Sequence, residues 1–74
     1  MRAIQQLLNA YGASLKKTPE PNSLVRWELR ARGVPEAVVT FIIPEWTPLR
    51  SVIERDLKPA LKLLLKERRK YEGR

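Results

Sequence analysis

The sequence predicts a small α+β domain in which an N-terminal helix, a β-hairpin and a long, kinked C-terminal helix follow one another. Apolar residues recur every three or four positions in the first and last parts of the chain, and they alternate with charged residues in the middle. A chain of 74 residues also has room for only one hydrophobic core. Residues 1–74 are therefore expected to form a single basic domain.

The first helix is predicted over residues 1–17. Its apolar positions are spaced as on one face of a helix: Ile4, Leu7, Leu8, Tyr11 and Leu15. Gly12 falls inside this helix, where it costs about 1 kcal/mol relative to Ala. Residues 18–23 contain two prolines, each of which disfavours a helical conformation of its predecessor, and are predicted to form a stiff linker.

Residues 24–44 are predicted to form an antiparallel hairpin. Its first half alternates apolar and charged residues, and this period of two fits better than a helix capped by Ser23. Turn-forming residues follow at 32–36, and residues 37–43 are rich in β-branched and aromatic side chains. Both faces of the second strand are partly apolar, so we expect a second copy of the chain to cover one of them, across an exposed edge or against a face. The expected assembly is a homodimer.

The C-terminal helix is predicted over residues 47–72, with Thr47 as N-cap and Pro48 in the first turn. Pro59 interrupts the backbone hydrogen bonding and is expected to kink the helix near residues 55–58. Two helices, with Asp56 as the second N-cap, are the competing interpretation. The apolar stripe keeps its phase across the proline through Leu49, Val52, Ile53, Leu57, Ala60, Leu61, Leu64 and Tyr71.

The chain is strongly basic, with 15 Lys and Arg against 8 Asp and Glu and a formal net charge of +7. Nine of those cations and four of the acidic residues lie from residue 47 onward, so the basicity is concentrated in the last helix. Nucleic acids and acidic protein surfaces are the partners that this charge favours.

Five cations of the last helix lie within one arc, nearly opposite the apolar stripe: Arg55, Lys58, Lys62, Lys66 and Arg69. Such a face can follow the phosphate backbone of DNA or RNA with little dependence on sequence. A merely solvated helix face is the competing interpretation. The sequence does not distinguish DNA from RNA.

A second basic patch is expected on the first strand of the hairpin, where Arg26, Arg30 and Arg32 alternate with apolar residues. A two-stranded ribbon with arginines can bind a DNA groove. The alternative, which we favour, is that Glu28 pairs with neighbouring arginines on an exposed face. Trp27 alternates with these charges and is expected in the core.

A rival function is a protein-binding module, such as a phage-type or plasmid-type inhibitor or an assembly adaptor. Its cations would dock on an acidic partner, and its interface would be formed by Val38, Ile42 and Trp46. Trp46 stands between the hairpin and the last helix, where an indole can anchor a partner or fix the start of the helix.

Catalysis is not expected, because the chain has no Cys, no His and a single Asp. No metal site, no cofactor and no glycine-rich phosphate loop is predicted. The apolar runs are too short to cross a bilayer and no signal-peptide pattern is present, so we expect a cytoplasmic protein without membrane contact.

The predicted order of helix, two strands and helix is comparable with double-stranded RNA-binding domains, which place a basic helix N-terminus on phosphates. The third strand of those domains and the basic loop that follows it are not predicted here, so the comparison is not adopted. The leading hypothesis is a small, non-catalytic nucleic-acid-binding protein with an accessory or regulatory role.

Overall fold

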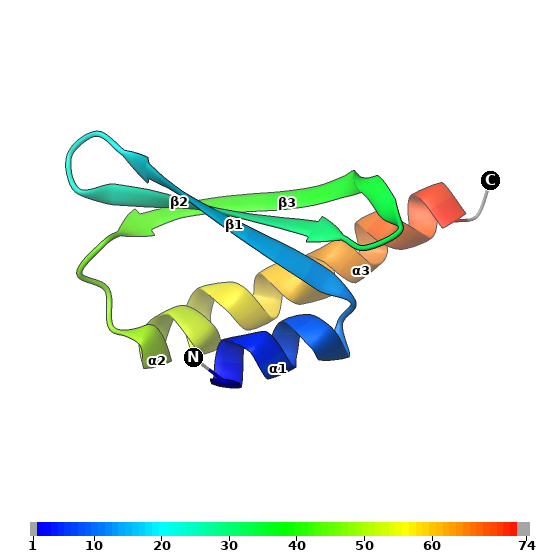
Figure 1. Ribbon diagram of the computed structural model, residues 1–74, viewed down its shortest axis with the longest axis horizontal. Helices are drawn as coiled ribbons and strands as arrows, with labels where there is room; N and C mark the ends of the chain where they lie inside the picture. The colour runs from blue at the N-terminus through cyan, green and yellow to red at the C-terminus, as the bar shows by residue number, and fades with distance from the viewer. Residues whose placement is uncertain (1, 73–74) are drawn as a thin grey trace.

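The computed structural model describes residues 2–72 and contains one strand more than the sequence predicts (Figure 1). The elements follow in the order α1 (Arg2–Ala10), β1 (Ala13–Glu20), β2 (Leu24–Ala31), β3 (Val34–Pro44), α2 (Leu49–Ser51), the π-helix η1 (Val52–Leu57) and α3 (Lys58–Glu72). The α+β class is confirmed, with an N-terminal helix, a three-stranded antiparallel sheet and a long, kinked C-terminal helix.

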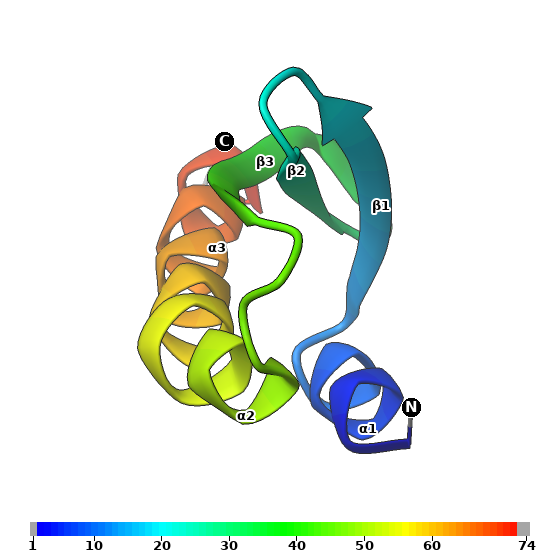
Figure 2. The same cartoon turned by 90° about the vertical axis from the view of Figure 1, so that its left-hand side faces the viewer.

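The three strands form a meander in the order β1-β2-β3, with both neighbouring pairs antiparallel. All the helices lie on one face of this sheet, and the other face is uncovered (Figures 1 and 2). The long helix packs mainly against β3 and β2, whereas α1 packs against β1 at the opposite side.

The predicted helix over residues 1–17 is wrong beyond Ala10, and the predicted linker over 18–23 is also wrong. Gly12 has a φ of +62°, a left-handed conformation that ends the helical path. The chain then enters β1, and only residues 21–23 form a turn. Leu15 is the source of the error, because it fits the helical spacing and equally the alternation of a strand.

Proline is tolerated in β1 because this strand is at the edge of the sheet. The backbone N–H of Arg32 donates to the carbonyl of Gly12 at 2.9 Å, which fixes the alternation of hydrogen bonds between β1 and β2. Even-numbered residues of β1 therefore point their backbone groups at β2 and odd-numbered residues point them away. Pro19 is at an outward position, where its missing N–H breaks no ladder bond.

Strands β2 and β3 occupy the range predicted for the hairpin. They are paired from Leu24 with Pro44 to Arg30 with Val38, and a shift in register follows before the turn at Arg32 and Gly33. Gly33 has a φ of +81°, a left-handed conformation at the second central residue of the turn that glycine adopts without steric cost. The side chains of β3 also alternate between the two faces of the sheet, as the sequence predicts.

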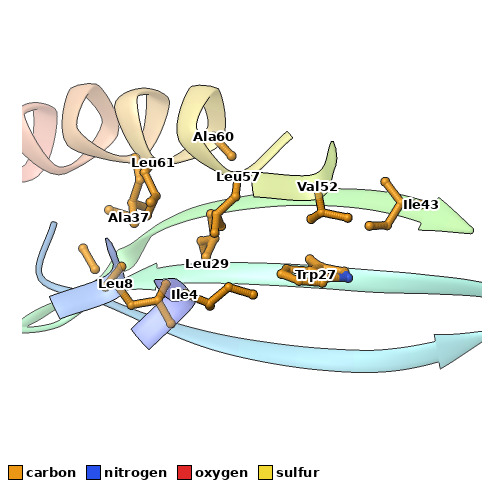
Figure 3. Close-up of a cluster of buried hydrophobic side chains, with 13 residues drawn as sticks. Ile4, Leu8, Trp27, Leu29, Ala37, Ile43, Val52, Leu57, Ala60 and Leu61 are labelled. Atoms are coloured by element: carbon orange, nitrogen blue, oxygen red, sulfur yellow. The ribbon is translucent and has the colours of Figure 1, made fainter. Parts of the chain in front are cut away.

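The core lies between the sheet and the helices (Figure 3). Leu29 of β2 and Leu57 and Leu61 of the long helix are fully buried at its centre. Trp27 is 5% exposed and its ring stacks on that of Phe41 at 5.6 Å, which confirms its predicted core position. Ile4 and Leu8 of α1 close the core beside β1.

The long C-terminal helix is continuous but changes its geometry before Pro59. In η1 the backbone bonds reach five residues back, and the N–H of Lys58 donates to the carbonyl of Ile53. Proline cannot donate a bond and its ring crowds the carbonyl four residues earlier, so a widened turn appears where Pro59 conflicts with α-helical geometry. Asp56 lies inside η1, and the interpretation as two helices with a cap at Asp56 does not hold.

The helix starts one residue later than predicted, since the N-cap is Pro48 and not Thr47. Pro48 occupies the N-cap position, without a side-chain cap, and Leu49 is the first helical residue. The hydroxyl of Thr47 donates instead to the carbonyl of Pro44 at 2.8 Å, so Thr47 stabilises the turn between β3 and the helix.

Candidate nucleic-acid interface

The side of α3 that faces away from the sheet carries three exposed cations. Leu61 and Leu64 are buried against the sheet, and the helical period places Lys62, Lys66 and Arg69 nearly opposite them. The three Cα atoms span seven residues, which corresponds to about 10 Å along the helix axis. They form one row, which we call the basic row, on a rigid element.

None of the three cations of the basic row makes an ion pair within residues 2–72. No carboxylate of the described part of the chain compensates their positive charges through an ion pair. A row of this kind is available to an external anion without first breaking an internal contact.

The other two cations predicted for this face are paired. Lys58 Nζ lies 2.8 Å from a carboxylate oxygen of Glu54, and Arg55 Nη2 lies 3.2 Å from one of Asp56. The five cations predicted for one face of the helix therefore differ in their ion pairing. Within residues 2–72, three of them make no ion pair and two of them make one.

The remaining cations of α3 form ion pairs with acidic residues of the same helix. Lys70 Nζ bonds to Glu67 at 3.0 Å, and Arg68 Nε lies 3.3 Å from Glu72. The side chain of Arg68 is turned toward Gly12, in the turn just before β1. Neither cation belongs to the basic row.

The basic patch predicted on the hairpin is largely neutralised. Arg26 pairs with Glu20 at 3.0 Å, and Arg30 pairs with Glu28 at 2.9 Å while also donating to the carbonyl of Pro35. Glu28 is thus an ion partner of an arginine, as the favoured interpretation has it, but the partner Arg30 lies on the same strand and the pair does not cross to a neighbouring strand.

Arg32 does not share a face with Arg26 and Arg30. It lies in the β2–β3 turn, and its guanidinium donates to the side-chain oxygen of Asn9 at 3.1 Å. Arg32 thus ties the turn to the end of α1. Its predicted place in a strand-face patch is wrong, because the strand ends at Ala31.

The residues of the predicted protein interface lie on two different parts of the molecule. Val38 and Ile42 share the uncovered face of the sheet, where Ile42 is half exposed. Trp46 lies in the segment after β3 and is 75% exposed, so its indole contributes little to the core.

A groove that the sequence does not predict separates α1 from the start of the C-terminal helix. It has a volume of about 570 Å³ and an apolar floor formed by Leu7, Leu49 and Ile53, with Arg50 and Lys58 at its rim. Leu49 and Ile53 belong to the predicted apolar stripe. Their position at the side of that stripe is the one feature of the sequence that points to the groove. The width of the groove itself depends on where α1 lies.

Among residues 2–72, no three acidic side chains come together in a way that could hold a metal ion. In the same range no helix is both long enough and apolar enough to span a bilayer. These findings concern the described part of the chain alone.

No protein-family model, no curated protein and no solved structure matches this chain.

Proposed function

We propose that this chain is a small, non-catalytic, cytoplasmic protein that binds the phosphate backbone of nucleic acids through the outer face of α3. The basic row of Lys62, Lys66 and Arg69 provides the primary contacts. Lys58 and Arg55 extend the site toward η1 when a phosphate replaces their carboxylate partners. The role is accessory or regulatory, since the site has groups that bind and none that react.

The observation that supports this proposal most strongly is the absence of acidic partners around the basic row within residues 2–72. Ion pairs occupy most other cations of the helix, but three neighbouring exposed ones are left without them. A surface selected only for solubility mixes both signs. Each strand of a duplex presents one phosphate charge per about 3.4 Å of axis, so a row about 10 Å long can meet several phosphates.

The expected binding mode is electrostatic and tolerant of sequence. Lys and Arg displace condensed counterions from the backbone, and the logarithm of the affinity falls linearly with the logarithm of the salt concentration. No exposed aromatic or amide side chain stands beside the row in residues 58–72, so base stacking and amide contacts to adenine are not expected there. DNA and RNA duplexes are both candidate ligands.

The third strand brings the element order closer to that of double-stranded RNA-binding domains than the sequence predicts. The segment after β3 still differs from them, because residues 45–48 contain one acidic residue and no cation. Duplex RNA is therefore included as one ligand of the test and is not assumed.

The test compares two triple variants that lose the same charge. The first is K62Q/K66Q/R69Q, which removes the basic row. The matched control is R2Q/K16Q/R50Q, which removes three exposed cations elsewhere. Binding of labelled duplex DNA, duplex RNA and single strands is measured by fluorescence anisotropy at several salt concentrations.

We expect the first variant to lose most of the affinity for at least one of the duplexes. The slope of log affinity against log salt should become shallower by about 2 to 3, since about 0.9 is lost for each phosphate contact. The control should keep most of the slope. Equal losses in both variants would show that only net charge matters, and no binding by the unmodified chain would overturn the proposal.

The second candidate function, a protein-binding module, is favoured by one observation: Trp46 is a large apolar side chain that is 75% exposed. Aromatic residues of this kind are frequent hot spots of protein interfaces. This function predicts that the chain binds an acidic protein and that W46A abolishes the interaction. Nucleic-acid binding does not depend on Trp46, so the two candidates are separable.

A further inference from the structure

Strand β3 forms one edge of the sheet and is its longest strand, with eleven residues. Its inner side pairs with β2, and no strand among residues 2–72 lies along its outer side. A row of backbone donors and acceptors is therefore unpaired on that side.

The hydrogen-bond alternation identifies which residues form this row. The N–H of Glu45 donates to the carbonyl of Ser23 at 2.8 Å, in continuation of the β2–β3 register. In an antiparallel pair alternate residues turn their backbone groups to the partner, so odd-numbered residues of β3 face β2. Val38, Thr40 and Ile42 consequently direct their N–H and C=O groups outward. The bond from Arg32 to Gly12 gives the same phase for β2.

The two edges of the sheet differ in how they are protected against pairing. The β1 edge contains Lys16, Lys17 and Pro19, the residue types that commonly block the addition of another strand. Residues 37–43 of β3 read Ala-Val-Val-Thr-Phe-Ile-Ile and contain no charge, no proline and no glycine. An edge of this composition pairs with another strand or aggregates.

Charge decides what kind of strand can cover the β3 edge. No cation lies between residues 36 and 45, and those two positions are both glutamates. The edge is therefore unsuited to a polyanion and suited to an uncharged strand. A second copy of β3 fulfils this condition, provided that the glutamates of the two copies do not face each other.

We propose that β3 pairs antiparallel with β3 of a second copy, with Thr40 opposite its own equivalent. In this register Val38 lies opposite Ile42 of the second copy, and each outward pair exchanges two hydrogen bonds. This register places Glu36, in the irregular part of β3 before Val38, beside Pro44 of the second copy and one residue from its Glu45, so no two glutamates are directly opposed. The result is a six-stranded sheet with a twofold axis perpendicular to it.

The same symmetry brings the two long helices together on one face of the sheet. Leu63 is 53% exposed and lies about 140° around α3 from Lys58, which lines the groove beside α1. Leu63 therefore faces away from α1, on the side of the β3 edge, where α3 of the second copy covers it. The basic rows of both copies remain on the outside.

The first test uses the mass of the unmodified chain, measured by size-exclusion chromatography with light scattering in the absence of nucleic acid. We expect twice the 8.6 kDa of one chain at micromolar concentration. T40K places two like charges at the centre of the proposed pair and should give the monomer mass. The control S14K adds the same charge to the same face at the β1 edge and should remain dimeric. A monomeric unmodified chain, or a folded T40K that stays dimeric, would overturn the proposal.

A second test does not depend on a disruptive substitution. The chain has no cysteine, so T40C introduces a single thiol. Cα atoms of directly opposed residues lie about 5.5 Å apart, within the range that a disulfide spans. T40C should form a covalent dimer under mild oxidation and S14C should not. Equal cross-linking of both variants would contradict the proposed register. Both tests are run without nucleic acid, so their outcome is independent of the proposed function.

Discussion

Lys58 Nζ lies 2.8 Å from the carboxylate of Glu54, four residues earlier and across the junction between η1 and α3. This contact divides the basic face predicted from the sequence, because it compensates Lys58 and leaves only the basic row farther along α3 without acidic neighbours. The pair is exposed on both sides, and exposed pairs contribute little to stability. Its main effect is on the electrostatic potential that an anion meets.

The first prediction concerns this pair. E54Q should raise the affinity for duplex nucleic acid about two- to fourfold at low salt, because it frees Lys58 and removes a negative charge beside the proposed site. The gain should shrink as the salt concentration rises. Unfolding free energy should change by less than about 0.5 kcal/mol. Fluorescence anisotropy and urea denaturation measure the two effects.

The control for E54Q is E45Q, which changes the net charge equally at an exposed residue before α2. If both variants bind equally well, Lys58 takes no part in the interface and the effect is one of overall charge.

The second prediction uses the two tryptophans as a matched pair. W46A should leave unfolding free energy within about 0.5 kcal/mol of the original and should not change nucleic-acid affinity, because the indole of Trp46 is mostly exposed. W27A should cost about 3 to 5 kcal/mol, because Trp27 is buried and stacks on Phe41. Thermal and urea denaturation test both. A loss of nucleic-acid binding in folded W46A would move the site away from α3.

The C-terminal helix could be predicted from the sequence because its signal is long and redundant. Its buried residues repeat at helical spacing on both sides of Pro59, and their burial is confirmed at Val52, Leu57 and Leu64. The widened turn of η1 could be anticipated only as a kink. Its hydrogen bonding depends on how the backbone accommodates the proline, which periodicity does not describe.

Strand β1 could not be predicted because its local signals are ambiguous. Leu15 fits two periods, and the acceptability of Pro19 depends on its being at an outward position of an edge strand, which is a tertiary property. The positive charges of Lys16 and Lys17 likewise suit the end of a helix and the edge of a sheet equally well.

The candidate site was predictable in position and not in detail. Rotation by 100° per residue places five cations on one side of the helix, and the three cations of the basic row lie there. Which cations have acidic partners depends on side-chain conformations around η1, where Glu54 bonds to Lys58 four residues later and Asp56 to the adjacent Arg55. The groove beside Leu49 depends on the distance between two segments far apart in the sequence.

The third prediction tests the turn that ends α1. If Gly12 were inside a helix, as the periodicity suggests, G12A would stabilise the protein by about 1 kcal/mol. The structure gives Gly12 a φ of +62° and places Arg68 Nη1 3.1 Å from the position of an added Cβ. G12A should therefore destabilise by about 1 kcal/mol, the usual cost of a left-handed conformation for Ala.

Two further variants sharpen this prediction, because the sign of the change is the decisive result. G33A should show a similar loss of about 1 kcal/mol, since Gly33 is also left-handed but has open space around the added atom. G12N should lose less than G12A, because asparagine tolerates this conformation, as Asn22 does at a φ of 65°. Urea denaturation of the three variants gives the comparison. A gain in stability for G12A together with a loss for G33A would mean that the helix continues through residue 12 and that β1 does not begin at Ala13.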